Sequence, residues 1–145
     1  MQHRRFAKWL IAVAVVIVVV SFAVKVCRHR AGTAATAADA PIGGIPKDAT
    51  DIEYYFPAAT LPNTYYEFNT SESGYRSWVA GWQGCTLSPI RRGTVSGYRY
   101  DLKTDESEIL EIEDGLIASW AEGDAGVYLT YDIKTGRAYF YSHTR

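Results

Sequence analysis

The longest apolar stretch of the chain lies near its start. From Trp9 to Val24 the only polar residue is Ser21, and counting outward to residues 6–26 gives 21 positions. At ~1.5 Å rise per residue, a helix of that length matches the ~30 Å hydrocarbon core of a bilayer. The flanking basic residues are Arg4, Arg5 and Lys8 on one side and Lys25, Arg28 and Arg30 on the other. The pattern predicts a short basic head (1–5) and a transmembrane helix over 6–26 that contacts a lipid bilayer.

Alternatives for this segment stay open. A cleaved secretory signal needs small residues one and three positions before its cleavage site, and the first such pair, Ala38 and Ala40, comes late after the apolar run. Orientation is nearly balanced because three basic residues face three. The free amino group favours a cytoplasmic N-terminus. We therefore expect a single-pass signal anchor with an extracytoplasmic C-terminal domain.

A segment of small and polar residues follows the apolar run. Residues 31–44 read AGTAATAADAPIGG, which offers little surface to bury. Such a composition is typical of a flexible linker. We expect a linker over 27–44 and a folded domain over 45–145.

The first half of this domain changes its hydrophobic period once. Aromatic-rich runs at 51–56 and 64–69 predict two strands, the first ended by Pro57. A helical spacing of i, i+3, i+4 and i+7 then predicts a helix over 73–83 with one apolar face. The residues on that face are Tyr75, Trp78, Val79 and Trp82. We expect both tryptophans to pack in the core.

The second half has short strand patterns separated by turn signals. After an extended connection with a strand near 98–102, strands are predicted at 109–112, 116–120, 127–133 and 137–143. Asp114-Gly115 suits a hairpin between the first two of these four. The order is β-β-α followed by a β-meander. The expected fold class is α+β, with one helix packed on an antiparallel sheet in a two-layer domain.

Two stretches carry a family resemblance. The run DGLIASWAEGDAGVYLTYDIKTGRAYFYSHTR, together with PKDATDIEYYF, resembles a group of small exported or membrane-anchored bacterial proteins. The shared pattern, DGL followed by YDxxTGRAY, consists of strand and turn residues typical of β-hairpins and contains no catalytic signature. The resemblance covers about 100 residues. The resemblance implies the placement and the fold, and it implies no function, because that group is uncharacterised.

Charge divides the chain into two parts. Of its 15 Lys and Arg, six lie in residues 1–30, which hold none of the 16 Asp and Glu. The remainder therefore carries nine basic residues against sixteen acidic ones. Such a domain repels phosphate, so we expect no nucleic-acid partner.

Few residues suit catalysis or metal binding. His143 is the one histidine after residue 30, and we expect it to be a solvated strand-end residue. One histidine cannot supply a usual metal set, and two cysteines, Cys27 and Cys85, form no C-x-x-C motif. Cys85 suits a small buried position. We predict no catalytic residue, no metal and no cofactor.

Carboxylates are the one group that leaves an enzyme open. They are Glu111, Glu113, Asp114, Glu122, Asp124 and Asp132. A glycosidase needs two converging carboxylates, one of them desolvated. Turns and outward positions on a solvated face explain the same residues. A membrane-tethered hydrolase using a carboxylate pair is therefore an alternative function.

Aromatic residues provide the more suggestive signal. Outward positions of the predicted meander offer a binding surface of Trp120, Tyr128, Tyr139 and Tyr141. The function is unknown from sequence. The favoured hypothesis is a membrane-anchored domain that binds an envelope protein or a glycan. A structural spacer is the third alternative.

Overall fold

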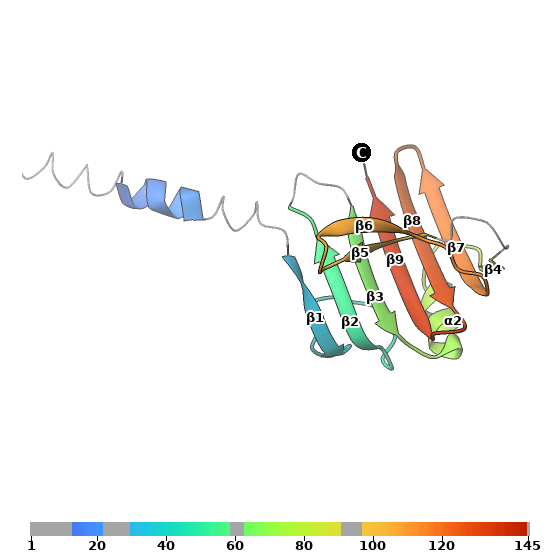
Figure 1. The fold of residues 1–145 in the computed structure, drawn as a ribbon. Helices are drawn as coiled ribbons and strands as arrows, with labels where there is room; N and C mark the ends of the chain where they lie inside the picture. Colours follow the sequence, from blue (N-terminus) through green and yellow to red (C-terminus); the bar gives the residue numbers. More distant parts are fainter. Residues whose placement is uncertain (1–12, 22–29, 59–62, 91–96, 145) are drawn as a thin grey trace, which may run out of the picture.

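The domain is built on one seven-stranded antiparallel sheet, shown in Figure 1. The computed structural model describes residues 13–21, 30–58, 63–90 and 97–144. Across the sheet the strands are β1 (Arg30–Thr36), β2 (Thr50–Phe56), β3 (Thr64–Asn69), β9 (Arg137–His143), β8 (Ala125–Asp132), β7 (Gly115–Glu122) and β4 (Ser88–Pro89). Strands β1 to β3 from the first half of the sequence and β7 to β9 from the second half join where β3 pairs with β9.

Helix α2 (Glu72–Ala80) covers one face of the sheet. Ser71 caps its start by accepting a hydrogen bond from the backbone N–H of Gly74 at 3.0 Å. Its apolar face is buried against β8 and its neighbours, where Phe68 and Leu129 have no exposed surface. The predicted helix is confirmed, as is the core position of Trp78, with Trp82 partly buried beside it.

A two-stranded hairpin crosses the opposite face. Strands β5 (Gly97–Asp101) and β6 (Glu106–Leu110) pair with each other and lie over β3, β9 and β8. The hairpin approaches closely at Gly97, where φ is +150° and a Cβ atom would lie 2.8 Å from Oγ1 of Thr130. Only glycine fits there without strain.

The fold therefore corrects the predicted architecture. The broad α+β character holds, but the domain is mostly antiparallel sheet and has three layers in place of two. The meander prediction failed at 109–112, because β6 pairs with β5 while β7 pairs with β8 and β4. The glycine of Asp114-Gly115 serves a close strand contact and not a hairpin turn, since a Cβ there would overlap the carbonyl oxygen of Tyr131.

The predicted linker also contributes to the fold. Residues 30–36 form β1 at the sheet edge, and Ala37, Ala40 and Ile42 pack against the core. Small residues suit this position, because a Cβ at Gly32 would lie 2.8 Å from the hydroxyl oxygen of Tyr54. A composition poor in bulky groups was therefore an unreliable sign of a linker.

The membrane prediction is corrected as well. Residues 13–21 are helical with exposed valine and isoleucine side chains. Within the described ranges, no helix combines the length and the apolar character needed to cross a bilayer. Within the described residues this finding contradicts the expected transmembrane helix over 6–26 and the single-pass localisation; positions 6–12 and 22–26 of the expected span lie outside those residues.

The residues predicted to flank the membrane fall mostly outside the description. Positions 1–12 and 22–29, and with them Arg4, Arg5, Lys8, Lys25 and Arg28, lie outside the described residues. Arg30 is described, and it is the exposed first residue of β1. Its place is therefore a sheet edge.

Candidate functional site

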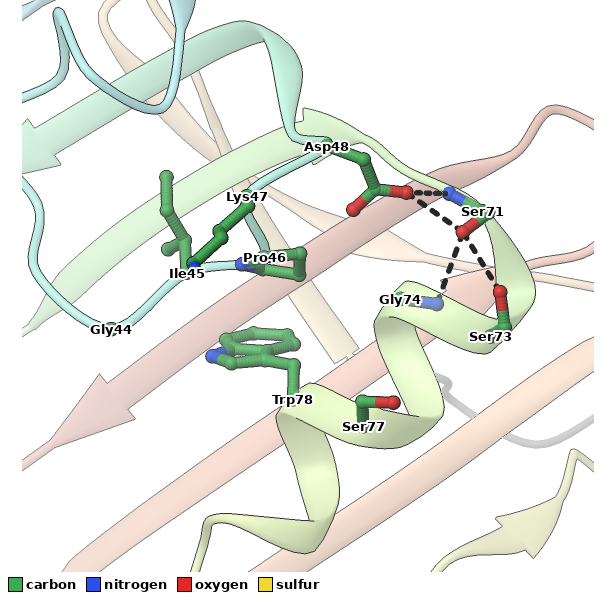
Figure 2. Close-up of a pocket in the computed structure, with 10 residues that line it drawn as sticks. All are labelled: Gly44, Ile45, Pro46, Lys47, Asp48, Ser71, Ser73, Gly74, Ser77 and Trp78. Atoms are coloured by element: carbon green, nitrogen blue, oxygen red, sulfur yellow. Dashed lines mark hydrogen bonds between the residues drawn. The ribbon is translucent and has the colours of Figure 1, made fainter.

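An open hollow of about 510 Å³ lies beside the start of α2. One wall is the segment 44–48, and the other is formed by the first two turns of the helix and the residues that cap it, from Ser71 to Trp78 (Figure 2). We call it the α2 hollow. Its volume falls within the ~300–1,000 Å³ typical of small-molecule sites.

Asp48 joins the two walls of the hollow. Its Oδ2 accepts hydrogen bonds from the backbone N–H of Ser71 at 3.1 Å and from the Ser71 hydroxyl at 2.7 Å, and its Oδ1 accepts from the Thr70 hydroxyl at 2.8 Å. Gly74 makes room for the carboxylate, since a Cβ there would lie 2.6 Å from Oδ1. A negative charge at a helix N-terminus is also favoured by the helix dipole.

These contacts set the charge of Asp48. Partial burial raises its pKa, but the hydrogen bonds from Ser71 and Thr70 together outweigh burial and hold the pKa below its ordinary value. The carboxylate is therefore ionised near neutral pH. Because it occupies the helix N-terminus itself, the hollow is not built for a second anion at that point.

The rest of the hollow combines apolar and hydroxyl surface. Trp78 is 7% exposed and borders the hollow below Ile45 and Pro46. The hydroxyls of Ser73 and Ser77 lie on the same helix as Trp78, with the Ser73 oxygen 3.1 Å from that of Ser71. Apolar and hydrogen-bonding groups side by side on the walls of the hollow suit a ligand that has both kinds of surface.

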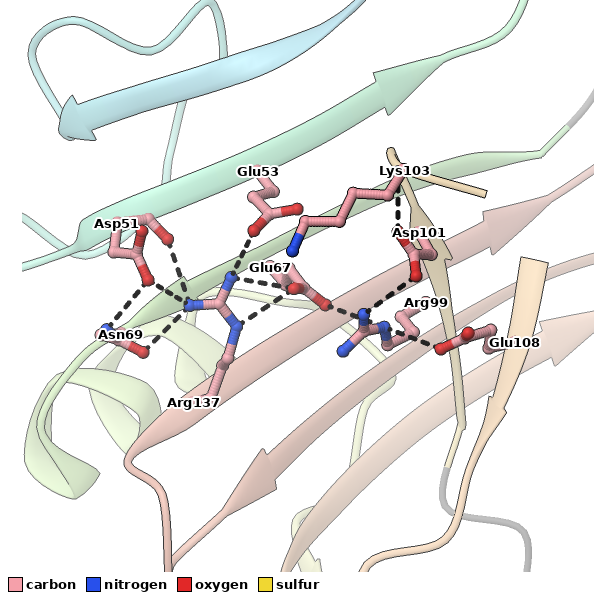
Figure 3. A network of polar contacts seen from close by, with 9 residues as sticks. All are labelled: Asp51, Glu53, Glu67, Asn69, Arg99, Asp101, Lys103, Glu108 and Arg137. Carbon is pink, nitrogen blue, oxygen red and sulfur yellow. Dashed lines mark hydrogen bonds and ion pairs between the residues drawn. The ribbon is translucent and has the colours of Figure 1, made fainter. Parts of the chain in front are cut away.

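A second polar cluster lies between the sheet and the hairpin (Figure 3). At its centre Glu67 is 5% exposed, and its Oε1 accepts hydrogen bonds from Nη2 and Nε of Arg137 at 2.8 and 3.1 Å. Arg137 also donates through Nη1 to Asp51 and Asn69. These contacts link β2, β3 and β9, so the cluster fixes their side-by-side order.

Arg99 connects this cluster to the hairpin. Its Nε lies 3.1 Å from a carboxylate oxygen of Glu108 on β6 and 4.0 Å from Oε2 of Glu67 on β3. Its Nη2 lies 3.9 Å from Asp101. The hairpin is therefore held over the sheet by charge as well as by packing.

A small crevice of about 10 Å³ adjoins Glu67. It is lined by both charged and aromatic groups, among them Glu53, Arg99, Tyr55 and Tyr100. Oε2 of Glu67 is buried and accepts no hydrogen bond from another described residue. Burial raises the pKa of Glu67, and the guanidinium groups of Arg137 and Arg99 oppose that shift without cancelling it. The space suits one water molecule and excludes a sugar-sized substrate.

Tyrosines fill the remainder of the hairpin interface. Tyr100 of β5 stacks on Tyr55 with ring centroids 3.8 Å apart, and Tyr98 lies 4.7 Å from Tyr141. Tyr65 continues the row between Tyr55 and Tyr141. Most of this aromatic surface packs the hairpin onto the sheet.

The predicted binding surface is divided by the sheet. Tyr128, Tyr139 and Tyr141 share the hairpin face, where Tyr128 pairs with Tyr141 and Tyr139 is 8% exposed. Trp120 points to the helix face, 37% exposed, with its ring close to Gly84. The four residues therefore do not form one platform.

His143 is not the solvated residue expected. Its ring stacks beside Tyr141 at 5.5 Å, and a Cβ at Gly126 would lie 2.5 Å from its Cε1. The imidazole is half-buried beside Tyr141 and Gly126, so its position is explained by packing and gives no sign of a catalytic role.

The predicted carboxylate pair does not converge. Glu122 and Asp124 lie at the turn between β7 and β8, and Asp114 lies beyond the opposite end of β7, where Gly115 pairs with Asp132. Asp132 is used locally, accepting hydrogen bonds from the Lys134 N–H and the Thr135 hydroxyl. Glu111 and Glu113 are exposed at the same end.

No group of three or more His, Cys, Asp or Glu side chains among the described residues is arranged to hold a metal ion. Cys85 is a half-buried thiol whose pKa is raised by burial. Cys27 lies outside the described residues.

The sequence analysis did not predict the residues that hold the α2 hollow and the Glu67 cluster together. Asp48 accepts a hydrogen bond from Ser71, 23 positions later in the sequence, and Arg137 donates one to Glu67, 70 positions earlier. One signal was available, because Glu67 stands between aromatic residues in the strand TYYEFN. A charge inside such a strand indicates a buried carboxylate that needs a basic partner.

No family model, no curated protein and no solved structure matches the chain.

Proposed function

We propose that the domain is a non-catalytic binding module that holds a carbohydrate in the α2 hollow. The supporting observation is that both walls of the hollow combine apolar and polar groups: Ile45 and Pro46 with the Asp48 carboxylate on one wall, and Trp78 with the Ser73 and Ser77 hydroxyls on the other. A sugar ring has C–H faces that pack on aromatic and aliphatic groups, and it has hydroxyls that need hydrogen-bond partners.

The hydrogen-bond inventory of the hollow supports this choice. Asp48 uses three of its roughly four acceptor positions internally, which leaves capacity for one ligand hydroxyl. Ser73 and Ser77 each bring a hydroxyl that both donates and accepts. The walls are held by Asp48, so little ordering cost is added on binding.

The test is a titration of the full chain with glucose, galactose, mannose, N-acetylglucosamine and their disaccharides. Backbone amide shifts in ¹H–¹⁵N spectra should change for Ser73, Gly74 and Ser77, together with the indole N–H of Trp78. Ser77→Tyr, which fills the hollow, should weaken binding at least about tenfold.

The matched control is Ala80→Tyr. Ala80 is exposed on the same helix and does not line the hollow, so this variant should bind as the parent does. Shifts scattered away from the hollow, or equal binding by the Ser77→Tyr variant, would contradict the proposal.

A further inference from the structure

The two edge strands of the sheet, β4 and β1, differ in length and in how well they can pair with a further strand. At one edge β4 is two residues long and contains Pro89, which cannot donate a backbone hydrogen bond. At the other edge β1 runs for seven residues, RAGTAAT, with no proline and no charged side chain between Arg30 and Thr36. The outward backbone groups of such a strand are a ready template for another strand.

We propose that β1 pairs antiparallel with β1 of a second copy of the chain, about a two-fold axis through Thr33. This register aligns all seven residues and extends the sheet across two molecules. It is self-complementary, as a two-fold interface must be.

Charge complementarity selects this occupant. In this register Arg30 lies opposite Thr36 of the second copy, and opposite residues in an antiparallel pair share a face. The Thr36 hydroxyl donates to Oδ2 of Asp39 at 2.7 Å, so a carboxylate lies beside that position. The Arg30 guanidinium therefore meets Asp39 of the second copy, and symmetry makes the ion pair twice.

The side chains of β1 leave room for a neighbour. Ala31, Thr33 and Ala35 are exposed on the hairpin face, and between Arg30 and Thr36 the residues on the helix face, Gly32 and Ala34, are equally small. At the axis Thr33 would face Thr33, a cross-strand pair that is favourable in antiparallel sheets.

Cysteine cross-linking tests the register. In full-length protein with Cys27 and Cys85 replaced by serine, Thr33→Cys places two thiols directly opposite each other, about 5 Å apart between Cα atoms. Mild oxidation should give a covalent dimer. Ala35→Cys is the matched control, because the two thiols would be about 13 Å apart and should cross-link at least about fivefold less.

Sedimentation equilibrium tests the energetics. Thr33→Lys puts two ammonium groups opposite each other and should raise the dimer dissociation constant at least about tenfold, whereas Thr104→Lys, in the exposed turn of the hairpin, should change it less than about twofold. Arg30→Glu should weaken the dimer, and adding Asp39→Lys should restore most of the loss.

Two results would overturn the proposal. One is a monomer at every concentration examined. The other is equal cross-linking at positions 33 and 35, which is the outcome if copies associate through the exposed apolar helix 13–21 and not through β1.

Discussion

The two faces of the sheet exclude water by different means. On the helix face Phe68, Tyr75 and Leu129 are fully buried among other apolar groups. On the hairpin face the most buried contacts include Glu67 with Arg137, surrounded by tyrosines. Apolar packing is strong but weakly directional, whereas ion pairs and hydrogen bonds fix which strands lie side by side. We therefore expect the helix face to supply most of the free energy of unfolding and the hairpin face to set which strands pair and in which register.

Removing an apolar group from the helix face should have the largest effect. Phe68→Ala deletes a ring with no exposed surface that packs edge-on against Trp78 at 5.2 Å. We expect a loss of about 3–5 kcal/mol in the free energy of unfolding, measured by urea denaturation. A loss below about 1 kcal/mol would mean that this face is not the main source of stability.

Breaking the ion pair should come next. Arg137→Met leaves the buried carboxylate of Glu67 without its main partner and should cost about 3 kcal/mol. The double variant Arg137→Met with Glu67→Leu should recover much of that loss, because an apolar pair needs no compensation. If adding Glu67→Leu does not recover stability, the ion pair itself stabilises the fold and does more than set the strand register.

The pH dependence of stability should reveal Glu67. Its pKa in the folded protein is above the ordinary value of about 4.3, so between those two values the folded state binds more protons than the unfolded state. The free energy of unfolding therefore falls through this titration as the pH rises. The free energy of unfolding should be measured from pH 4 to 7 at constant ionic strength for both proteins. The value of the parent minus that of Glu67→Gln should fall as the pH rises. A constant or growing difference would refute the assignment.

The smallest effect is expected at the hairpin turn. The Tyr100 hydroxyl donates to the Asp105 side chain at 2.7 Å, and Asp105 has a φ of +60°. Tyr100→Phe keeps the stack on Tyr55 and removes the hydroxyl's contacts with both the side chain and the carbonyl oxygen of Asp105, so we expect a loss of about 0.5–1.5 kcal/mol. A loss as large as that of Arg137→Met would show that the hydroxyl stabilises more of the fold than the turn at Asp105.

The elements formed by local pattern could be predicted, and their pairing could not. Strands 64–69 and 137–143 and the helix around Trp78 follow from alternation and helical spacing within a few residues. The hairpin could not be found in this way, because residues 106–110 read equally well as a partner for the strand that follows. What decides the pairing is the turn at Asp105 and the close approach of Gly97 to the sheet, and neither leaves a periodic signal.

The candidate site was harder still. Asp48 gives no sign in the sequence that it will cap a helix 23 positions later, since a cap from a distant loop obeys no local spacing. Of the four aromatic residues predicted to form a binding surface, Tyr128, Tyr139 and Tyr141 share the hairpin face. Trp120 lies on the opposite, helix face, because it pairs with Val127 and alternates with the residues of β7 that face the hairpin.

The central pairing of β3 with β9 also sets the order in which the protein can form. Residues 64–69 find their partner only at 137–142, so β3 must wait until about 70 further residues have been synthesised. At roughly 10 residues per second this is a delay of several seconds on the ribosome. Throughout it the aromatic segment TYYEFN has one side without its final neighbour, which makes this segment the expected site of chaperone contact and of misassembly.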